Sequence, residues 1–243
     1  MKKVDIFGVE FAVTTYSEAT RLIINNARQR NSFAVFALPV HGVIESRTDS
    51  TFCKALERAD LIVPDGQPIK WAMNYFYQTN LTDRVYGPVL VSSLLERANQ
   101  EKLRVFLYGG STTEVLHDFK AQIENQYQHL TICGYHREQH LNQNTLSANQ
   151  INTVGAHIIL VGLGCPVQEK WIAKNKGQVN AAMIGVGAAF SFISGHTQMA
   201  PNWMQKRGLE WLYRLYREPG RLWKRYFYTN LYFVCLVLRR LIK

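Results

Sequence analysis

The carboxylate of Asp65 is a candidate catalytic group because of its position in the sequence. Asp65 follows the apolar residues Leu61–Val63 and lies between Pro64 and Gly66. Taken alone, Pro-Asp-Gly favours an ordinary turn in which Pro and Gly set the backbone and Asp caps it. A carboxylate at the end of a strand also suits a general base that removes a proton from a substrate hydroxyl. The local sequence leaves both interpretations open and favours the turn.

Glycine-rich loops are candidate phosphate sites. Gly109–Gly110, Gly162–Gly164 and Gly185–Gly187 each follow an apolar segment. Backbone amides of such loops, together with the positive end of a following helix, can hold a phosphate. However, Ser111 and Glu114 have the spacing of a helix capping box, which needs no ligand and is the favoured interpretation there. The loop at 185–187 also lacks the third glycine of a dinucleotide-binding motif, and the sequence contains no P-loop motif.

Two polar side chains accompany these loops. Arg84 has the geometry to pair bidentately with a diphosphate, or it is simply exposed. Gln168 follows Pro166 at the start of a predicted helix and can direct its amide at a ligand. Glu169 is then a first-turn acid that interacts favourably with the helix dipole. The sequence has no Asp-x-Asp, so we expect no divalent metal bridging a nucleotide diphosphate.

The C-terminal segment carries most of the positive charge. Residues 205–243 contain ten Lys and Arg but only two Glu, a net formal charge of +8 in a chain of +10. Helical spacing places these cations on shared faces, which usually means a solvated surface. Because five of them flank Pro219-Gly220 and lie near Trp211 and Trp223, a phosphate-binding cradle is favoured here. The five are Arg214, Arg217, Arg221, Lys224 and Arg225.

The same segment predicts two helices. Pro201 can start a helix that runs to Tyr216, and Pro219 should break it because the preceding Glu218 is pushed out of the helical region. The apolar residues Leu231–Leu238 number eight, whereas a spanning helix needs about 20. This segment is therefore expected to lie on a membrane, to pack on the protein's own core, or to pack on a second copy in a homo-oligomer. Cations interleaved with aromatics suit a bilayer face with phosphorylated headgroups.

The elements that position these residues predict an α/β fold. Apolar segments at 33–38, 61–63, 105–108, 158–161 and 182–184 each end in a Gly or Pro loop and precede a helical pattern. This order is typical of a mostly parallel sheet with helices on both faces. In such sheets ligands bind beyond the carboxyl ends of the strands, so the five loops should share one edge. We expect a core over residues 1–195 and an appendage over 196–243.

Composition excludes several classes of protein. A hydrophobic content of 47% and a charged content of 19% indicate a globular chain. Four distant cysteines without C-x-x-C argue against a disulfide scaffold or a zinc site and fit a reducing compartment. The N-terminus has Asp5 and Glu10 where a signal peptide needs an apolar core. The basic charge raises a nucleic-acid-binding alternative, but no such motif is present and the C-terminal segment is too apolar for a groove binder.

Several segments together resemble the WecG/TagA/CpsF family of bacterial glycosyltransferases, glycosyltransferase family 26. They occur in the family's order and spread over most of residues 33–228. The matching segments are VPDGQPIKW (63–71), DRVYGPVLV (83–91), VFLYGG (105–110), VGLGCPVQEKWI (161–172), IGVGAAFSFISG (184–195) and APNWMQKRGLEWLYRLYREPGRLWKRYFY (200–228).

The resemblance implies a Rossmann-like core with a C-terminal appendage that meets the membrane. It further implies an inverting, metal-independent transfer of a sugar from a UDP-sugar to a polyprenyl-diphosphate-linked saccharide. The products would enter surface polysaccharides such as capsule, exopolysaccharide or wall polymers. The enzyme would be cytoplasmic and peripheral on the inner face of the plasma membrane, with no cofactor.

The resemblance also implies residue roles. Asp65 matches the proposed catalytic base, and Arg84 and Gln168 match polar pocket residues near phosphate and donor. The cations Arg214, Arg221 and Arg225, with Arg217 and Lys224 beside them, match appendage residues that neutralise diphosphate charge. Donor binding falls to glycine loops at the sheet edge, with Gln168 beside them: Gly109, Gly110, Gly164 and Gly187.

The sequence departs from the family pattern in two places. Many members have T-x-N where this chain has Ala37-Leu38-Pro39, and many have F-D-F where it has Phe190-Ser191-Phe192. We therefore expect a UDP-hexose donor, such as UDP-glucose, in preference to the N-acetylated or uronic donors of better-known relatives. His41 is near the first departure, where a helix-start histidine without chemistry is the favoured interpretation. A catalytically inactive relative that serves as a binding or regulatory partner in polysaccharide assembly is the alternative.

Overall fold

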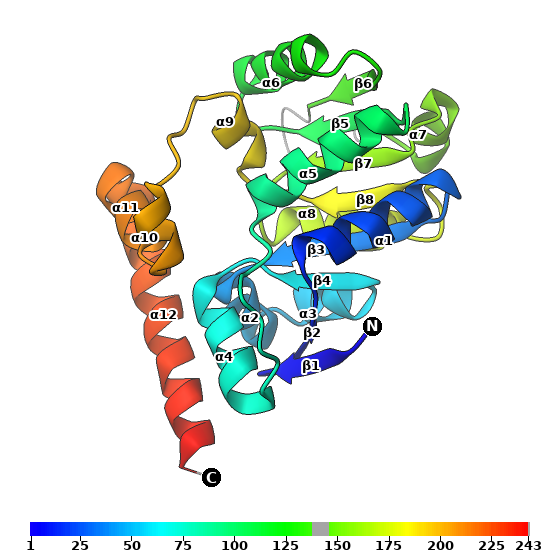
Figure 1. Cartoon of the computed structure of the whole chain (residues 1–243). Coiled ribbons are helices and arrows are strands. Elements are labelled where there is room, and N and C mark those ends of the chain that lie inside the picture. Colours follow the sequence, from blue (N-terminus) through cyan, green and yellow to red (C-terminus); the bar gives the residue numbers. More distant parts are fainter. Residues whose placement is uncertain (138–145, 243) are drawn as a thin grey trace.

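A six-stranded parallel sheet forms the centre of the molecule. A computed structural model of the chain describes residues 1–137 and 146–242 (Figure 1). The strands lie in the order β4-β3-β8-β7-β5-β6, and every neighbouring pair is parallel. Their bounds are β3 Phe33–Leu38, β4 Leu61–Pro64, β5 Arg104–Gly109, β6 Thr131–His136, β7 Ile158–Gly162 and β8 Ala182–Gly185.

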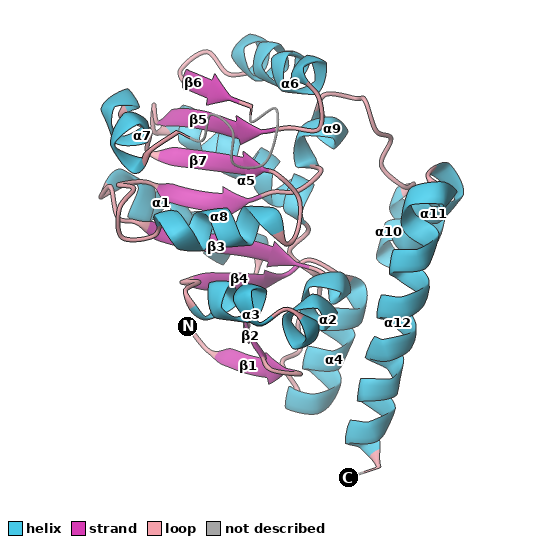
Figure 2. Ribbon diagram, turned by 180° about the vertical axis from the view of Figure 1, so that it is seen from behind, coloured by secondary structure: helices cyan, strands magenta, loops and turns pink. Residues whose placement is uncertain are grey.

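Helices cover both faces of this sheet, as Figures 1 and 2 show from opposite sides. One apolar cluster joins the sheet to α1 (Tyr16–Arg28), α5 (Gly87–Gln100), α6 (Thr113–Gln126) and α9 (Ala189–Ile193). The cluster on the other face includes α2 (Val40–Thr48), α3 (Ser50–Glu57), α4 (Gln67–Tyr77), α7 (Ala148–Val154) and α8 (Val167–Asn175). Strands buried on both faces explain the continuous apolar segments of the sequence.

The five predicted strands are all present, and their parallel pairing places their five C-terminal loops at one edge. Three strands were not predicted. β6 is a half-buried edge strand, and β1 (Lys3–Ile6) and β2 (Val9–Ala12) form an antiparallel hairpin outside the main sheet. Apolar residues of the hairpin, such as Ile6 and Phe11, are fully buried in the core.

The start of α6 differs from the expected capping box. Thr112, not Ser111, caps the helix: its hydroxyl accepts a hydrogen bond from the Val115 N–H at 3.2 Å. The helix begins one residue later than the sequence pattern suggested, so a box between Ser111 and Glu114 is wrong. The Ser111 hydroxyl instead lies 3.2 Å from the hydroxyl of Ser191.

The C-terminal segment forms three helices at the C-terminal edge of the sheet (Figure 1). They are α10 (Asn202–Lys206), α11 (Glu210–Arg217) and α12 (Pro219–Leu241). The predicted break before Pro219 is confirmed, since Glu218 has φ −135° and ψ 57°. The prediction of one helix from Pro201 to Tyr216 is wrong because Gly208 adopts a left-handed φ of +71°, which separates α10 from α11.

Helix α12 has a covered face and a free face. On the covered face, Phe233 is 5% exposed and its ring meets that of Phe7 at a centroid distance of 5.4 Å. Near the end of the helix, Arg240 donates to the hydroxyl of Tyr77 at 2.8 Å. Part of Leu231–Leu238 therefore packs on the protein's own core, as one interpretation of the sequence had it.

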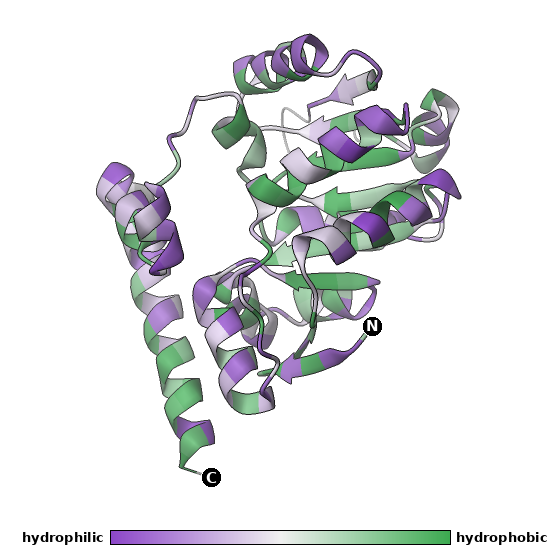
Figure 3. Ribbon diagram, in the orientation of Figure 1, coloured by the Kyte–Doolittle hydropathy of each residue, from purple (hydrophilic) through white to green (hydrophobic). Residues whose placement is uncertain are grey.

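The free face is an apolar stripe that repeats every three or four residues. Most of the C-terminal half of α12 is green in the hydropathy colouring of Figure 3. Within the part of the chain that the structure describes, no helix is both long enough and apolar enough to span a membrane. The residues of this outer stripe are Trp223, Phe227, Leu231, Val234, Leu238 and Leu241.

Candidate active site

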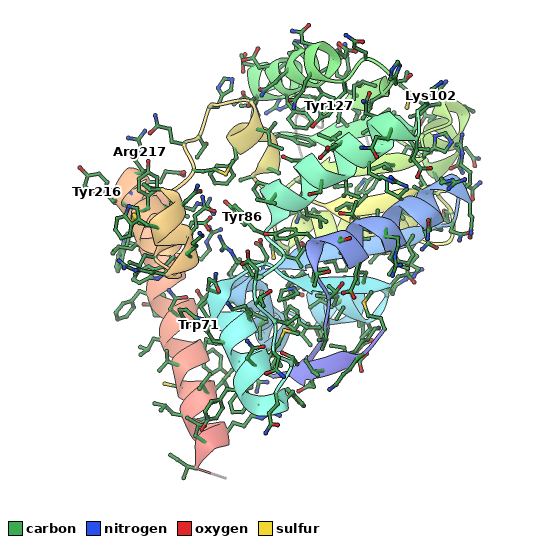
Figure 4. The ribbon with its side chains drawn as sticks, viewed as in Figure 1. Trp71, Tyr86, Lys102, Tyr127, Tyr216 and Arg217 are labelled. Atoms are coloured by element: carbon green, nitrogen blue, oxygen red, sulfur yellow. The ribbon has the colours of Figure 1, made fainter. Side chains whose placement is uncertain are left out.

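A cavity of about 260 Å³ lies between the C-terminal edge of the sheet and helices α11 and α12. We call it the Asp65 cavity. Figure 4 shows Tyr86 on the sheet side of this region and Trp71 on α4, both facing the appendage. The walls of the Asp65 cavity come from the loops after β3, β4, β7 and β8 and from the appendage. The lining residues include Ala37, Pro39, His41, Asp65, Arg84, Tyr86, Gly164, Gln168, Gly187, Glu210, Trp211, Arg214, Arg225, Tyr226 and Asn230.

Asp65 is held by the start of a neighbouring helix. Its Oδ1 accepts a hydrogen bond from the Gly87 N–H at 2.8 Å, at the beginning of α5. The separate turn favoured at Pro64–Gly66 is not formed: the chain passes from Pro64, the last residue of β4, through Asp65 to Gly66, the N-cap residue of α4, which the Asp65 side chain does not cap. Burial, together with the charge of Glu210, raises the pKa of Asp65 to about 6, against the lowering influence of Arg84 and Gly87. A carboxylate of this kind is a stronger base than an exposed Asp and remains ionised at neutral pH.

Arg84 is already paired inside the protein. The side chain is 7% exposed, and its guanidinium forms an ion pair with the carboxylate of Glu210 from α11. A second nitrogen donates to the backbone oxygen of Asp65 at 3.3 Å. The guanidinium also lies 4.3 Å from the ring centroid of Tyr86. Arg84 therefore lines the cavity as expected, but its charge is neutralised by a partner that the sequence did not indicate.

A second cavity, of about 730 Å³, adjoins the first. We call it the Ser111 cavity. It is bounded by the loops after β5, β7 and β8, by the segment leading to α10, and by α11. The two cavities share Gly164, Gly187, Ala188 and Arg214. Ser111 and Ser191 line only the second, as do Gly110, His196 and Arg217.

Gln168 braces two of the glycine loops. Its Oε1 accepts hydrogen bonds from the Gly164 N–H at 3.1 Å and from the Gly187 N–H at 2.9 Å. Its Nε2 donates to Glu169 at 2.8 Å, and the side chain is 3% exposed. Because these bonds use both ends of the amide, Gln168 holds the loops after β7 and β8 in place rather than presenting a free amide.

Glu169 lies in the first turn of α8, as the sequence indicated, but it is not in contact with solvent. It is fully buried, and burial raises its pKa to about 7 against the hydrogen bond from Gln168. Its influence on the site passes through Gln168, since it does not itself line either cavity.

The four glycines predicted to bind the donor have different surroundings. Gly164 and Gly187 line both cavities, although their N–H groups are bound by Gln168. Gly110 lines the Ser111 cavity, and its N–H donates to Gly162 at 2.9 Å. Gly109 lines neither cavity; a Cβ there would come within 2.9 Å of the Gly162 backbone, so it allows β5 and β7 to approach. These loops therefore shape the cavities rather than offering free backbone N–H groups to a ligand.

Of the four predicted phosphate-binding cations whose side chains the structure describes, three line the cavities. Arg214 lines both, Arg225 lines the first and Arg217 lines the second. The Nε atoms of Arg214 and Arg225 are buried and have no hydrogen-bond partner among the described residues. Lys224 is exposed, 6.0 Å from the ring centroid of Trp223, and lines neither cavity. Arg221 belongs to α12, but its side chain lies outside the described part of the chain.

Several cavity residues were missed or undervalued from the sequence. Glu210 and Tyr86 lie in segments that match the family, 200–228 and 83–91, but they were assigned no role, and only the fold brings them to Asp65. His41 was interpreted as a helix-start residue without chemistry, yet it lines the Asp65 cavity. Burial and the charge of Arg225 lower the pKa of His41 to about 4, so its ring is neutral at physiological pH. Ala37 and Pro39, the residues of the T-x-N departure, line the same wall.

The arrangement suits proton removal from a hydroxyl next to a phosphorylated group. The carboxylate of Asp65, whose pKa is raised, lines the first cavity. Arg214 and Arg225, whose Nε atoms have no partner among the described residues, line the same cavity, and Arg214 also lines the second one. Within the described ranges, no group of three His, Cys, Asp or Glu side chains is placed to hold a metal ion.

Comparisons with known proteins give a consistent result. The family model described as "Glycosyl transferase WecG/TagA/CpsF family" matches residues 4–243. A Bacillus subtilis (strain 168) protein named N-acetylglucosaminyldiphosphoundecaprenol N-acetyl-beta-D-mannosaminyltransferase is 34% identical over 178 residues, covering 73% of this chain and 68% of the relative. A Staphylococcus aureus (strain NCTC 8325) protein of the same name is 30% identical over 227 residues, covering 90% of this chain and 88% of the relative.

Proposed function

Because the chain belongs to the WecG/TagA/CpsF family of glycosyltransferases, we propose that it transfers a sugar from a UDP-sugar to a saccharide carried on a polyprenyl diphosphate. The observation that carries this proposal is the position of Asp65 in a cavity that also contains Arg214 and Arg225. The names of the relatives support the acceptor class, since both act on an N-acetylglucosaminyl diphosphoundecaprenol. The product would serve surface polysaccharide synthesis.

We assign the two cavities to the two substrates of this reaction. We place the UDP-sugar in the Ser111 cavity, between the glycine loops and the Arg214–Arg217 side of α11. We place the acceptor saccharide in the Asp65 cavity, with its diphosphate toward Arg225. The shared wall at Gly187, Ala188 and Arg214 is then the place where the anomeric carbon meets the acceptor hydroxyl.

The chemical step inverts the anomeric centre. The acceptor oxygen forms a bond to the anomeric carbon while its proton passes to Asp65. The bond from that carbon to the UDP oxygen breaks, and UDP leaves with the bonding electron pair. Arg214 and Arg217 stabilise the charge that develops on the leaving diphosphate, in the role that a metal has in other glycosyltransferases.

The donor is the finer part of the proposal. Ala37 and Pro39 give the Asp65 cavity an apolar wall where many family members have Thr and Asn. We propose that the sugar of the donor extends from the Ser111 cavity across the shared boundary into the Asp65 cavity, where this wall selects a UDP-hexose such as UDP-glucose. The names of the relatives favour the alternative donor, UDP-N-acetylmannosamine.

The outer stripe on α12 supports a peripheral position on the inner face of the plasma membrane. Its apolar side chains are exposed, and the exposed Lys224 and Arg239 suit anionic headgroups. A lipid-linked acceptor would be reached at this surface without a spanning helix.

The test is release of UDP by the purified protein with a panel of UDP-sugars and synthetic lipid-diphosphate saccharides. We expect release with one donor, dependent on acceptor and retained in EDTA. UDP-N-acetylmannosamine reacting far faster than every simple hexose donor would overturn the donor assignment. No release by a folded, vesicle-bound protein would favour the non-catalytic alternative.

A further inference from the structure

The junction between α10 and α11 closes over Asp65 through one buried carboxylate. Glu210, the first residue of α11, is 8% exposed although it belongs to a strongly basic surface segment. Its partner Arg84 is 126 positions away in sequence and equally buried. Both side chains line the cavity of Asp65, and Arg84 also donates to the Asp65 backbone oxygen. The ion pair between Glu210 and Arg84 therefore joins the appendage to the part of the core that holds Asp65, the candidate base.

A second close contact lies beside this pair, between Gly208 and helix α4. A Cβ placed on Gly208 would come within 2.7 Å of the Trp71 ring and 3.2 Å of Gln67 on α4. The backbone of Gly208 is also left-handed, at φ +71°, which a β-branched residue tolerates poorly. Gln67 in turn donates to the Gln205 backbone oxygen at 3.5 Å. The close packing at Gly208 and the ion pair between Arg84 and Glu210 together fix the position of α11.

We propose that Glu210 is a positioning residue that fastens the α10–α11 segment to Arg84 and thereby closes the acceptor cavity over Asp65. The inference rests on the proposed function for its purpose, but the fastening itself is a property of the fold. In the unmodified protein the carboxylate of Glu210 neutralises the charge of Arg84, so Arg84 lowers the pKa of Asp65 less than an unpaired guanidinium would. Without Glu210, a buried guanidinium would be left without its carboxylate, which favours opening of the segment to water.

The electrostatic consequence can be measured at Asp65 itself. The charged and titratable groups that face this carboxylate are Arg84, Tyr16, Tyr86, Glu210 and Arg214. Glu210 raises the pKa of Asp65 and Arg84 lowers it. Removal of the Glu210 charge and hydration of the opened site both lower the pKa of Asp65, whereas withdrawal of Arg214 on α11 raises it; we expect a net lowering because burial is the largest cause of the raised value. Gly208→Val, which opens the segment but keeps the charge of Glu210, should therefore lower the pKa of Asp65 less than Glu210→Gln does.

The experiment compares Glu210→Gln, Glu210→Asp and Gly208→Val with the unmodified full chain. Amide hydrogen exchange over residues 202–217 reports docking, and ¹³C NMR of the Asp65 carboxyl reports its titration. For Glu210→Gln we expect exchange at least about tenfold faster in that segment, with β3 and β8 still protected, and a lower Asp65 pKa. Glu210→Asp should restore part of both effects. Gly208→Val should open the segment while every charged group is kept.

Tyr216→Ser is the control, since Tyr216 is 82% exposed and points away from the core in Figure 4. It should leave exchange and titration as in the unmodified chain. Unchanged exchange in Glu210→Gln, or faster exchange with an unmoved Asp65 titration, overturns the proposal. Neither readout needs turnover. A chain with no transferase activity would therefore contradict the proposed function, and the role of Glu210 would still be decided.

Discussion

At the scale of single residues, Asp65 carries the chemistry, and its substitution is the direct test. Asp65→Asn keeps the shape of the side chain but removes the base, so we expect turnover to fall by roughly 10²–10⁴-fold. Initial rates of UDP release, with acceptor saturating, measure this loss. Glu124→Gln, an exposed change on α6, should leave the rate unchanged. Comparable turnover in the two variants would remove Asp65 from the mechanism.

The protonation of Asp65 also predicts the pH dependence of turnover. Its pKa is raised to about 6, and only the ionised form accepts a proton. The value of kcat/KM should therefore be constant above that pH and fall about tenfold per pH unit below it. A profile of kcat/KM from pH 4.5 to 8 measures this acid limb, because kcat/KM reports the free enzyme. A limb near pH 4, the ordinary range of Asp, would contradict the raised pKa.

The same burial has a cost in stability that can be observed without substrate. A group whose pKa is raised on folding binds protons more tightly when folded, so its charge destabilises the fold above pH 6. Asp65→Asn should accordingly raise the Tm at pH 7.5 by about 2–4 °C, corresponding to about 1 kcal/mol. The gain should vanish at pH 4. Thermal scans at the two pH values decide this, and a lower Tm at both would mean that the hydrogen bond to Gly87 matters more.

At the scale of the elements, the loops after β7 and β8 depend on one buried amide. Gln168→Leu would leave the Gly164 and Gly187 N–H groups without partners and remove the hydrogen bond that Gln168 donates to Glu169. We expect a loss of about 3 kcal/mol, seen as a Tm lower by about 6–12 °C, and a higher KM for the UDP-sugar. The exposed Gln126→Leu is the control. A higher KM without any loss of Tm would instead indicate direct contact between Gln168 and the donor.

The elements also mark what the sequence could predict. The five buried strands were predictable because parallel strands covered on both faces are continuous apolar segments. β6 was missed because it is a half-buried edge strand, and the β1–β2 hairpin because exposed residues interrupt its strands, which are therefore not continuous apolar segments. The helix from Pro201 was extended too far because periodicity does not reveal the left-handed backbone of Gly208.

The candidate site was predictable only in part. Asp65 and the cationic residues could be located because motif and charge are local features. The Arg84–Glu210 pair could not, since it joins residues 126 positions apart and no spacing rule covers such a contact. The brace made by Gln168 was likewise invisible, because it depends on how the loops after β7 and β8 approach each other. Local patterns located the groups, whereas the fold decided which of them are free.

At the scale of the whole molecule, α12 serves two surfaces, and substitutions can separate them. Phe227 is 59% exposed on the outer stripe, whereas Phe233 is buried against the core. Phe227→Ser with Leu231→Ser should weaken binding to vesicles containing phosphatidylglycerol by at least about tenfold, with little change in Tm. Cosedimentation measures this binding, which should also weaken as salt increases.

Phe233→Ser is the opposite case and should lower the stability of the fold by about 3–5 kcal/mol. Unchanged vesicle binding in the outer-stripe variant would show that the stripe does not face lipid. Truncation after Gly195 is a less discriminating experiment, because it would also remove Phe233 and Leu236 from the core.

The Asp65 cavity has a further consequence for the order of assembly. Under the proposed function, one wall holds the diphosphate at Arg225 and another holds the reacting hydroxyl at Asp65, within a single space of about 260 Å³. The enzyme therefore measures how far the growing saccharide extends from its lipid anchor. A short stem of sugar fits between the two walls, whereas a long glycan would place its far end beyond the reach of Asp65. Such a site commits the molecule to the opening steps of a polymer and leaves elongation to other enzymes.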